Sequence, residues 1–144
     1  MERNLSKIIE CLSTIKGVKE IREDDGYIVF YYRRACFLAL FVDGCGKLDR
    51  FIHITLNFDM GIDDIQMDLA RKTCFETMLK YESLRLFIND DAYNSICIHF
   101  MADYEDKQLA KTIKLNLNDS VEAHKFFIDY FMMMDSHNLN FKKS

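Results

Sequence analysis

The sequence has no proline and only five glycines, and it contains no internal repeat and no low-complexity stretch. Linkers between domains are usually marked by these residues or by biased composition, so nothing divides the chain. Its 144 residues match the size of one ordinary domain. We therefore expect a single α+β domain over residues 1–144.

Clusters of basic residues are also missing. The chain carries 19 Lys and Arg against 23 Asp and Glu, which gives a formal net charge of −4. No basic run is longer than Arg33-Arg34 or Lys142-Lys143. Because proteins bind a phosphate backbone mainly through positive charge, the composition predicts that nucleic acid is not a partner.

Long apolar runs are absent, since no stretch approaches the roughly 20 residues that cross a bilayer. The first ten residues, MERNLSKIIE, lack the basic and apolar regions of a secretory signal. The cysteines are odd in number and include no CxxC pair, which suits reduced thiols better than a disulfide framework. They are Cys11, Cys36, Cys45, Cys74 and Cys97. We expect a cytoplasmic protein without a membrane partner.

Motifs of catalytic and cofactor-binding sites are missing as well, because no GxSxG, HExxH, SxxK or Rossmann glycine pattern occurs. His53 and His99 fall on expected strands, the latter on the same face as Cys97. A metal site or an acid/base pair would form there if the strands were neighbours. Ordinary sheet residues with satisfied ring nitrogens are the simpler interpretation. The sequence predicts no catalytic residue, cofactor or metal, and it leaves open a small ligand- or metal-binding protein or enzyme at these three residues.

The chain begins with an amphipathic helix followed by strands. Asn4 is a suitable N-cap, apolar residues recur at helical spacing from Leu5 to Ile15, and Gly17 supplies a stop. Four runs rich in β-branched and aromatic residues come next, separated by turn signals. They are VKEIR, YIVFYY, CFLALFV and RFIHITLNF. These runs predict an antiparallel meander.

A second helix is predicted from Asp63 to about Tyr81. Asp63 and Gln66 can form a capping box, with Ile62 and Met67 as the flanking hydrophobic staple. The helix leads into the runs SLRLFIN and YNSICIHFM, which predict a hairpin.

The rest of the chain is expected to form one more short element and a last helix. The hairpin turn is predicted at Asp90-Asp91. TIKLNLN, within residues 107–118, alternates like a further short strand or an ordered connection. A capping box at residues 119–122 then begins a helix that continues to about Asp135.

The last helix is apolar around most of its circumference. FFIDYFMMMD and the residues before it leave only a narrow polar stripe of Glu122, Lys125 and Asp129. A surface helix usually has an apolar stripe little wider than about 100°, so this helix must be covered on more than one side. YIVFYY and CFLALFV are likewise apolar on both faces. Either the chain's own helices cover these surfaces or a second subunit does, and our hypothesis is a homodimer.

The order helix, antiparallel meander, helix, hairpin, helix resembles the type III secretion chaperone-like fold, and in particular the YbjN-like family of proposed sensory transduction regulators. The segments that carry the resemblance are NLSKIIECLSTI, YIVFYY, CFLALFV, FIHITLNF, IQMDLARKTCFETMLKY, LRLFINDDAYNSICIHFM and VEAHKFFIDYF. They span nearly the whole chain. The expected fold is therefore α+β, an antiparallel meander sheet with three helices in the order α-β-β-β-α-β-β-α.

The resemblance implies a small, cytosolic, often dimeric protein that binds other polypeptides without catalysing a reaction. A non-enzymatic protein-binding module, chaperone-like or regulatory, is the expected function, with the protein partner unidentified. Its contact residues are expected on the last helix and on the apolar side of the second. They are Met67, Cys74, Met78, Phe127, Phe131, Met132 and Met134. An immunity-type protein that binds a toxin is a further alternative, because such proteins are also small, acidic and without catalytic motifs.

Overall fold

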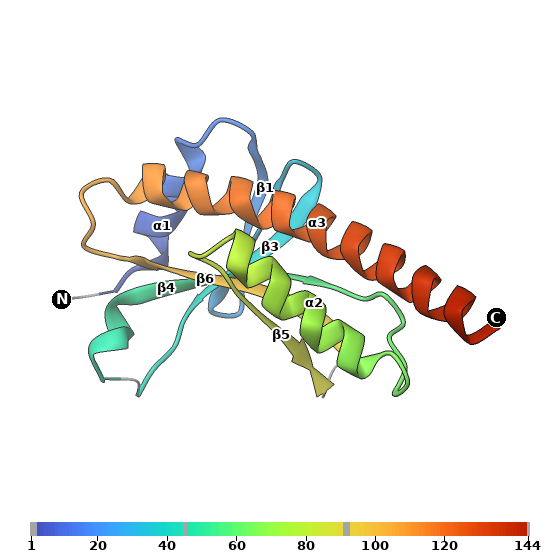
Figure 1. Cartoon of the computed structure of the whole chain (residues 1–144). Coiled ribbons are helices and arrows are strands. Elements are labelled where there is room, and N and C mark those ends of the chain that lie inside the picture. The colour runs from blue at the N-terminus through green and yellow to red at the C-terminus, as the bar shows by residue number, and fades with distance from the viewer. Residues whose placement is uncertain (1–2, 45, 91–92, 144) are drawn as a thin grey trace. The chain divides into compact units, whose positions relative to one another are not determined.

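The computed structural model describes residues 3–44, 46–90 and 93–143, which form three α-helices and six β-strands (Figure 1). In chain order the elements are α1 (Leu5–Ser13), β1 (Val18–Asp24), β2 (Tyr27–Tyr32), β3 (Ala35–Phe41), the 3-10 helix η1 (Gly46–Arg50), β4 (Phe51–Phe58), α2 (Met67–Lys80), β5 (Arg85–Asn89), β6 (Ser95–Asp103) and α3 (Leu109–Lys143).

The predicted α+β class is confirmed, as is the order helix, meander, helix, hairpin, helix. All four runs of the meander form strands, so VKEIR adds β1 to the three strands of the expected order. Cys45, one of the five cysteines, and Asp91, which the sequence placed in the hairpin turn, lie outside the described residues.

The strands belong to one sheet with the order β1-β2-β3-β4-β6-β5. The first four pair antiparallel with their neighbours in the chain. Because β6 lies next to β4, the strand β5, which precedes β6 in the chain, lies at the end of the sheet. The strands β1 and β5 therefore each have one edge without a neighbouring strand, which decides where another chain could pair.

The residues divide into two compact units. Unit 1 consists of Met1–Leu56 and His99–Asn118, and unit 2 consists of Asn57–Ile98 and Asp119–Ser144. Unit 1 contains α1, β1 to β3, most of β4, the end of β6 and the start of α3. Unit 2 contains α2, β5, the start of β6 and the rest of α3. Among the described residues, no helix combines the length and the apolar character needed to cross a membrane.

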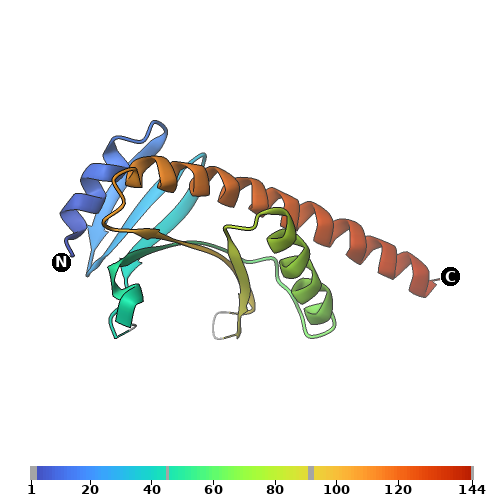
Figure 2. The ribbon, with the colours of Figure 1, turned by 60° about the vertical axis from the view of Figure 1, so that its left-hand side comes forward.

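In unit 1 the side chains of β2 alternate between a buried and a half-buried face. Ile28 and Phe30 of β2 are fully buried, whereas Val29 between them is not. Figure 2 shows α1 and the start of α3 on the same side of β1 to β3, and the Tyr32 hydroxyl donates to Asn118 Oδ1 at 2.7 Å. One face of these strands thus forms the core of unit 1.

The predicted Asn4 cap and the predicted Asp63–Gln66 capping box are confirmed by their hydrogen bonds. The Asn4 side chain accepts from the Ser6 amide at 2.8 Å. The Gln66 amide donates to Asp63 Oδ1 at 2.9 Å, and the Asp63 amide donates to Gln66 Oε1 at 3.1 Å, which is the expected reciprocal capping box. This box closes a turn at residues 64–66, so α2 itself begins at Met67.

The prediction for residues 107–118 is wrong, because α3 begins at Leu109 and contains the whole of TIKLNLN. Leu109, Ile113 and Leu117 recur every four residues and are buried, while Leu115 is exposed. A strand would have placed residues 113, 115 and 117 on one face. In the helix, Ile113 and Leu117 lie on the buried side and Leu115 lies on the exposed side.

The start and end predicted for the last helix are corrected too. Residues 119–122 lie inside α3, and the helix continues past Asp135 to Lys143. Its N-terminus is stabilised by Asp106, whose carboxylate accepts from the Gln108 amide at 2.8 Å and the Thr112 hydroxyl at 2.9 Å. These hydrogen bonds, that of the amide first, lower the pKa of Asp106.

Substitutions at Ile113 and Leu115 test the helical register of residues 109–118. Ile113→Ala removes a fully buried side chain and should lower the free energy of unfolding by about 3 kcal/mol. Leu115→Ala should change it by no more than roughly 0.5 kcal/mol, because Leu115 is exposed. Urea unfolding measures both, and equal losses would contradict the helix.

The turn between β2 and β3 gives a second prediction. Arg33 and Arg34 have φ angles of 49° and 69°, a left-handed conformation that costs a non-glycine residue about 1 to 2 kcal/mol. Since glycine also adds freedom to the unfolded chain, Arg34→Gly should raise the free energy of unfolding by roughly 0.5 kcal/mol. The matched control is Arg22→Gly in the extended strand β1, which should lower it by about as much. If both changes lowered the free energy of unfolding, the strain proposed for the left-handed backbone of Arg34 would be contradicted.

Candidate functional site

In unit 2, α2 runs alongside the second half of α3 in the opposite direction. Just before α2, Gln66 Nε2 donates to Asp135 Oδ2 at 3.2 Å. At the other end of α2, Lys80 Nζ lies 4.7 Å from the centre of the Phe126 ring, and the Tyr81 ring packs edge-on against Phe126 with centroids 6.3 Å apart. The pair is held at both ends, so the surface of α2 has a fixed orientation within the unit.

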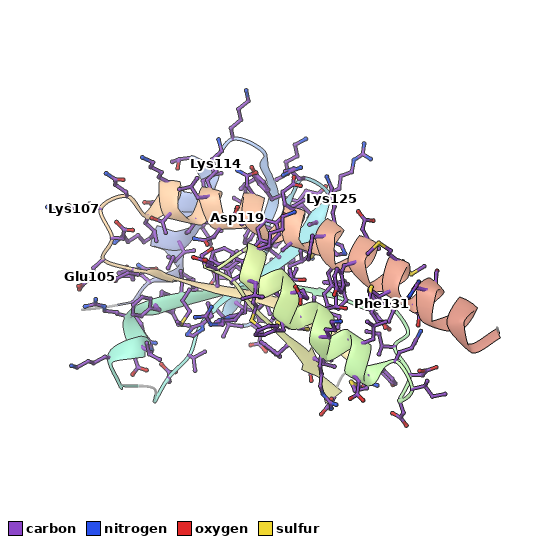
Figure 3. The ribbon with its side chains drawn as sticks, viewed as in Figure 1. Glu105, Lys107, Lys114, Asp119, Lys125 and Phe131 are labelled. Carbon is purple, nitrogen blue, oxygen red and sulfur yellow. The ribbon has the colours of Figure 1, made fainter. Side chains whose placement is uncertain are left out.

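Phe127 and Phe131 form the interior of this unit. The Phe127 ring packs edge-on against Phe58 at 5.5 Å and stacks with Phe131 at 6.2 Å, and both α3 side chains are buried. Figure 3 shows Phe131 on the side of α3 opposite to Lys125, which is exposed. Both residues were predicted as protein contacts, and their burial gives them a packing role here.

A groove of about 280 Å³ lies between α2 and β5, which run side by side in Figure 1. We call it the α2–β5 groove. It is lined by Arg71, Cys74, Met78, Leu86, Phe87, Ile88 and Asp90. Burial raises the pKa of the Cys74 thiol to about 11, so this thiol is protonated at neutral pH and acts as a small apolar group.

Large apolar side chains are exposed beside the groove. Phe75 and Leu79, one turn apart on α2, are 56% and 58% exposed, and Phe87 on β5 is 48% exposed. Two methionines of α3 in the same unit, Met132 and Met133, are also exposed, at 54% and 61%. Seven of the ten large apolar side chains that are exposed among the described residues belong to unit 2, so this unit is the better candidate for an interaction surface.

A second, smaller hollow lies along α3. It has a volume of about 230 Å³ and is lined by Phe126, Asp129, Tyr130 and Met133. Its lining includes Met133, one of the two exposed methionines of α3. Flexible thioether side chains next to a hollow can adapt to apolar groups of different shapes.

The structure brings together some of the predicted contact residues. Cys74 and Met78 line the α2–β5 groove, and Met67 falls on the same stripe of α2, four residues before Arg71. Met132 is exposed, whereas Met134 is half-buried.

Sequence reasoning missed Phe75, Leu79 and Phe87. A signal for the first two was present, because they share a stripe of α2 with the exposed Asp68 and Lys72. Apolar residues within the polar stripe of a helix are unlike the usual pattern and favour a contact role.

His53 and His99, which the sequence left open as a pair, are neighbours in unit 1. His53 Nδ1 lies 2.9 Å from His99 Nε2, and the rings stack with centroids 5.1 Å apart. One of these two nitrogens must donate and the other accept. The remaining nitrogen of His53, Nε2, is buried without a hydrogen-bond partner. Burial also lowers the pKa of His53, which favours the neutral ring.

Two hollows lie elsewhere in unit 1. One, of about 430 Å³, is beside the β2–β3 turn, and the other, of about 320 Å³, is between α1 and the start of α3. The first is lined by Gly17, Lys19, Glu20, Tyr31, Arg33 and Arg34, and the second by Lys7, Glu10, Cys11, Thr14, Asp106, Lys107, Leu109 and Ala110.

The histidine pair lies away from the four hollows described above. His53, His99 and Cys97 line none of these four hollows, and burial raises the pKa of Cys97 to about 11. Within the described part of the chain, no cluster of three or more His, Cys, Asp and Glu residues is placed to hold a metal. The pair can share a proton, but three protein ligands do not converge there.

Comparisons with known proteins give information about the fold and not about the function. No protein-family model matches the sequence, and no curated protein matches it. Among solved structures, the chain is similar to an uncharacterized protein from Methanothermobacter thermautotrophicus, with a TM-score of 0.55 and 11% sequence identity. The match covers 90% of this chain and 96% of the archaeal one. The fold therefore recurs as a whole, and at this identity the likeness carries no function.

Acid titration tests the buried state of His53. Because its folded pKa is below the ordinary value of 6.5, the unfolded chain binds more protons as the pH falls through about 6.5, and the free energy of unfolding decreases. His53→Leu should reduce this decrease between about pH 7 and pH 5 by up to one bound proton. The control His137→Leu replaces an exposed residue. Thermal unfolding over this pH range measures the slope, and an unchanged slope for His53→Leu would contradict the assignment.

Proposed function

We propose that the chain is a non-enzymatic protein-binding module, chaperone-like or regulatory, that contacts other polypeptides through unit 2. The contact surface consists of the α2–β5 groove and the exposed apolar residues beside it, Phe75 and Leu79 on α2 and Phe87 on β5. The single observation that carries the proposal is this concentration of exposed apolar side chains around an apolar groove.

The energetics support a contact role for these residues. Taking a large apolar side chain from water into an interface contributes roughly 1.5 to 3 kcal/mol. Phe75 and Leu79 are each more than half exposed, so most of this stabilisation is absent in the free chain. A partner that covers both would obtain it, and the antiparallel contact with α3 keeps α2 oriented for such a partner.

The chemistry expected of the partner follows from the lining. The groove is mainly apolar, with Arg71 and Asp90 as its charged residues. A segment with apolar side chains at alternating positions therefore fits better than a strongly charged one. The proposal is in line with the resemblance of the sequence to the YbjN-like family, and it includes the expected cytoplasmic location and homodimer.

The histidine pair favours one second candidate function, a small ligand- or metal-binding protein. Its supporting observation is the 2.9 Å contact between His53 and His99. Two imidazoles supply two ligands, so a metal would need the others from water or a bound molecule. Calorimetric titration of zinc into the wild type and His53→Leu tests this candidate, and equal heats for the two proteins would remove it.

Binding of an unfolded polypeptide tests the main proposal. The probe is a fluorescently labelled, carboxymethylated polypeptide that cannot fold, and anisotropy reports its binding. The double variant Phe75→Ser, Leu79→Ser should bind roughly tenfold more weakly than the wild type, because it loses the apolar area of both side chains.

The matched control is Lys72→Ser, which changes another exposed residue of α2 and should leave binding within about twofold. Circular dichroism shows whether the variants keep their fold. Absence of binding by the wild type, or equal binding by the wild type and the double variant, would contradict the proposal.

A further inference from the structure

The two end strands of the sheet differ in how they are protected against pairing. The strand β1, VKEIRED, carries five charged side chains in seven residues. Its register against β2 shifts between Lys19 and Arg22, and Glu20 in this interval has a φ of 55°. Charged residues and bulges on an end strand hinder the addition of another strand. The outer edge of β1 is therefore closed to a partner.

The outer edge of β5 carries one charged residue, Arg85, and none of its residues has a positive φ. Its sequence, RLFIN, has three consecutive apolar residues. It lies at the end of the sheet order and lines the α2–β5 groove through Leu86, Phe87 and Ile88. A regular apolar end strand next to an apolar groove is a site for strand addition.

We propose that the strand added to β5 is the β5 of a second copy of this chain, paired antiparallel about a two-fold axis at Phe87. In this register Phe87 lies opposite Phe87, Leu86 opposite Ile88, and Arg85 opposite Asn89. Residues that are opposite each other share a face of the sheet, and this register meets that condition at every position. The inference rests on the proposed function, because the second copy would be a protein partner of the same groove.

Charge favours a second copy as the partner. Arg85 begins β5 and Asp90 directly follows it, and both are exposed. A two-fold antiparallel arrangement places the basic start of each strand beside the acidic end of the other, so the complementary contact occurs twice. A parallel arrangement of the same two strands would place like charges together.

The apolar side chains fit the same arrangement. Leu86 is buried and Phe87 is half exposed, so they point to opposite faces of β5. The pairing continues the sheet, so Leu86 and Ile88 of the second copy extend the face that lines the groove with Cys74 and Met78. On the other face the two Phe87 rings become a cross-strand aromatic pair. One partner thus covers both the groove and Phe87.

Exchange of the two charges tests the proposal. Sedimentation equilibrium of the wild type should show association of the 17.1 kDa chain to a dimer at concentrations up to roughly 100 μM. Arg85→Asp alone places carboxylates together at both ends of the paired strands, and Asp90→Arg alone places cations together there. Each variant should dimerise roughly tenfold more weakly.

An equimolar mixture of the two variants is the decisive sample. One Arg85→Asp chain and one Asp90→Arg chain again bring opposite charges together at both ends, so the mixture should dimerise nearly as well as the wild type. A wild type that stays monomeric up to roughly 100 μM would overturn the proposal. So would a wild-type dimer that neither variant weakens, or variants that the mixture does not rescue.

Cysteine cross-linking gives an independent measurement of the register. In a chain with the exposed Cys36 changed to serine, Phe87→Cys places two thiols directly opposite each other and should form an intermolecular disulfide under mild oxidation. Arg85→Cys is the control, because residue 85 lies opposite residue 89 and not opposite itself. Equal cross-linking of the two variants would contradict a two-fold axis at Phe87.

The same samples separate this inference from the proposed function. If the chain is monomeric but still binds the unfolded polypeptide, the self-pairing and the expected homodimer fail, and the protein-binding role of unit 2 stands. If the charge exchange behaves as expected but the polypeptide is not bound, the proposed function fails and the β5 pairing stands.

Discussion

An open β-sheet ends in two strands whose outer N–H and C=O groups have no neighbouring strand, and these groups must bond to water, to a covering segment or to another strand. In this chain the strand order assigns the ends to β1 and β5, which meet the constraint differently. The first is charged and bulged, and the second is short, regular and apolar. That contrast decides where a partner can add a strand, because β5 lines the α2–β5 groove and carries the exposed Phe87.

Local sequence predicted the elements whose signals agree with each other. The Asp63–Gln66 capping box formed with both of its hydrogen bonds, and the four meander runs and the two hairpin runs all became strands. The segment TIKLNLN failed because its apolar residues fit two periods. Ile113 and Leu117 would share one face of a strand, and they also lie about one turn apart on one side of a helix. Only the exposure of Leu115 distinguishes the helix from the strand. Asp106, whose carboxylate caps the helix, was the overlooked signal.

The candidate site could be predicted only in part. The spacing of Cys74 and Met78 put them on one side of α2, where the groove lies. Composition could not distinguish the buried Phe131 from the exposed Met132, because a helix that is apolar nearly all round gives no sign of which side is covered. The identity of β5 as an end strand was beyond local reasoning, since it depends on β6 pairing with β4, a long-range choice that no short pattern specifies.

Hydrogen exchange of the backbone amides of β5, measured at low and high protein concentration, tests the central claim most directly. If the outer edge of β5 pairs with another copy, protection within Arg85–Asn89 should increase with concentration, while protection within Val18–Asp24 of β1 stays constant. If the protection of β5 does not depend on concentration, or if β1 gains protection in its place, the account of the open edge is contradicted.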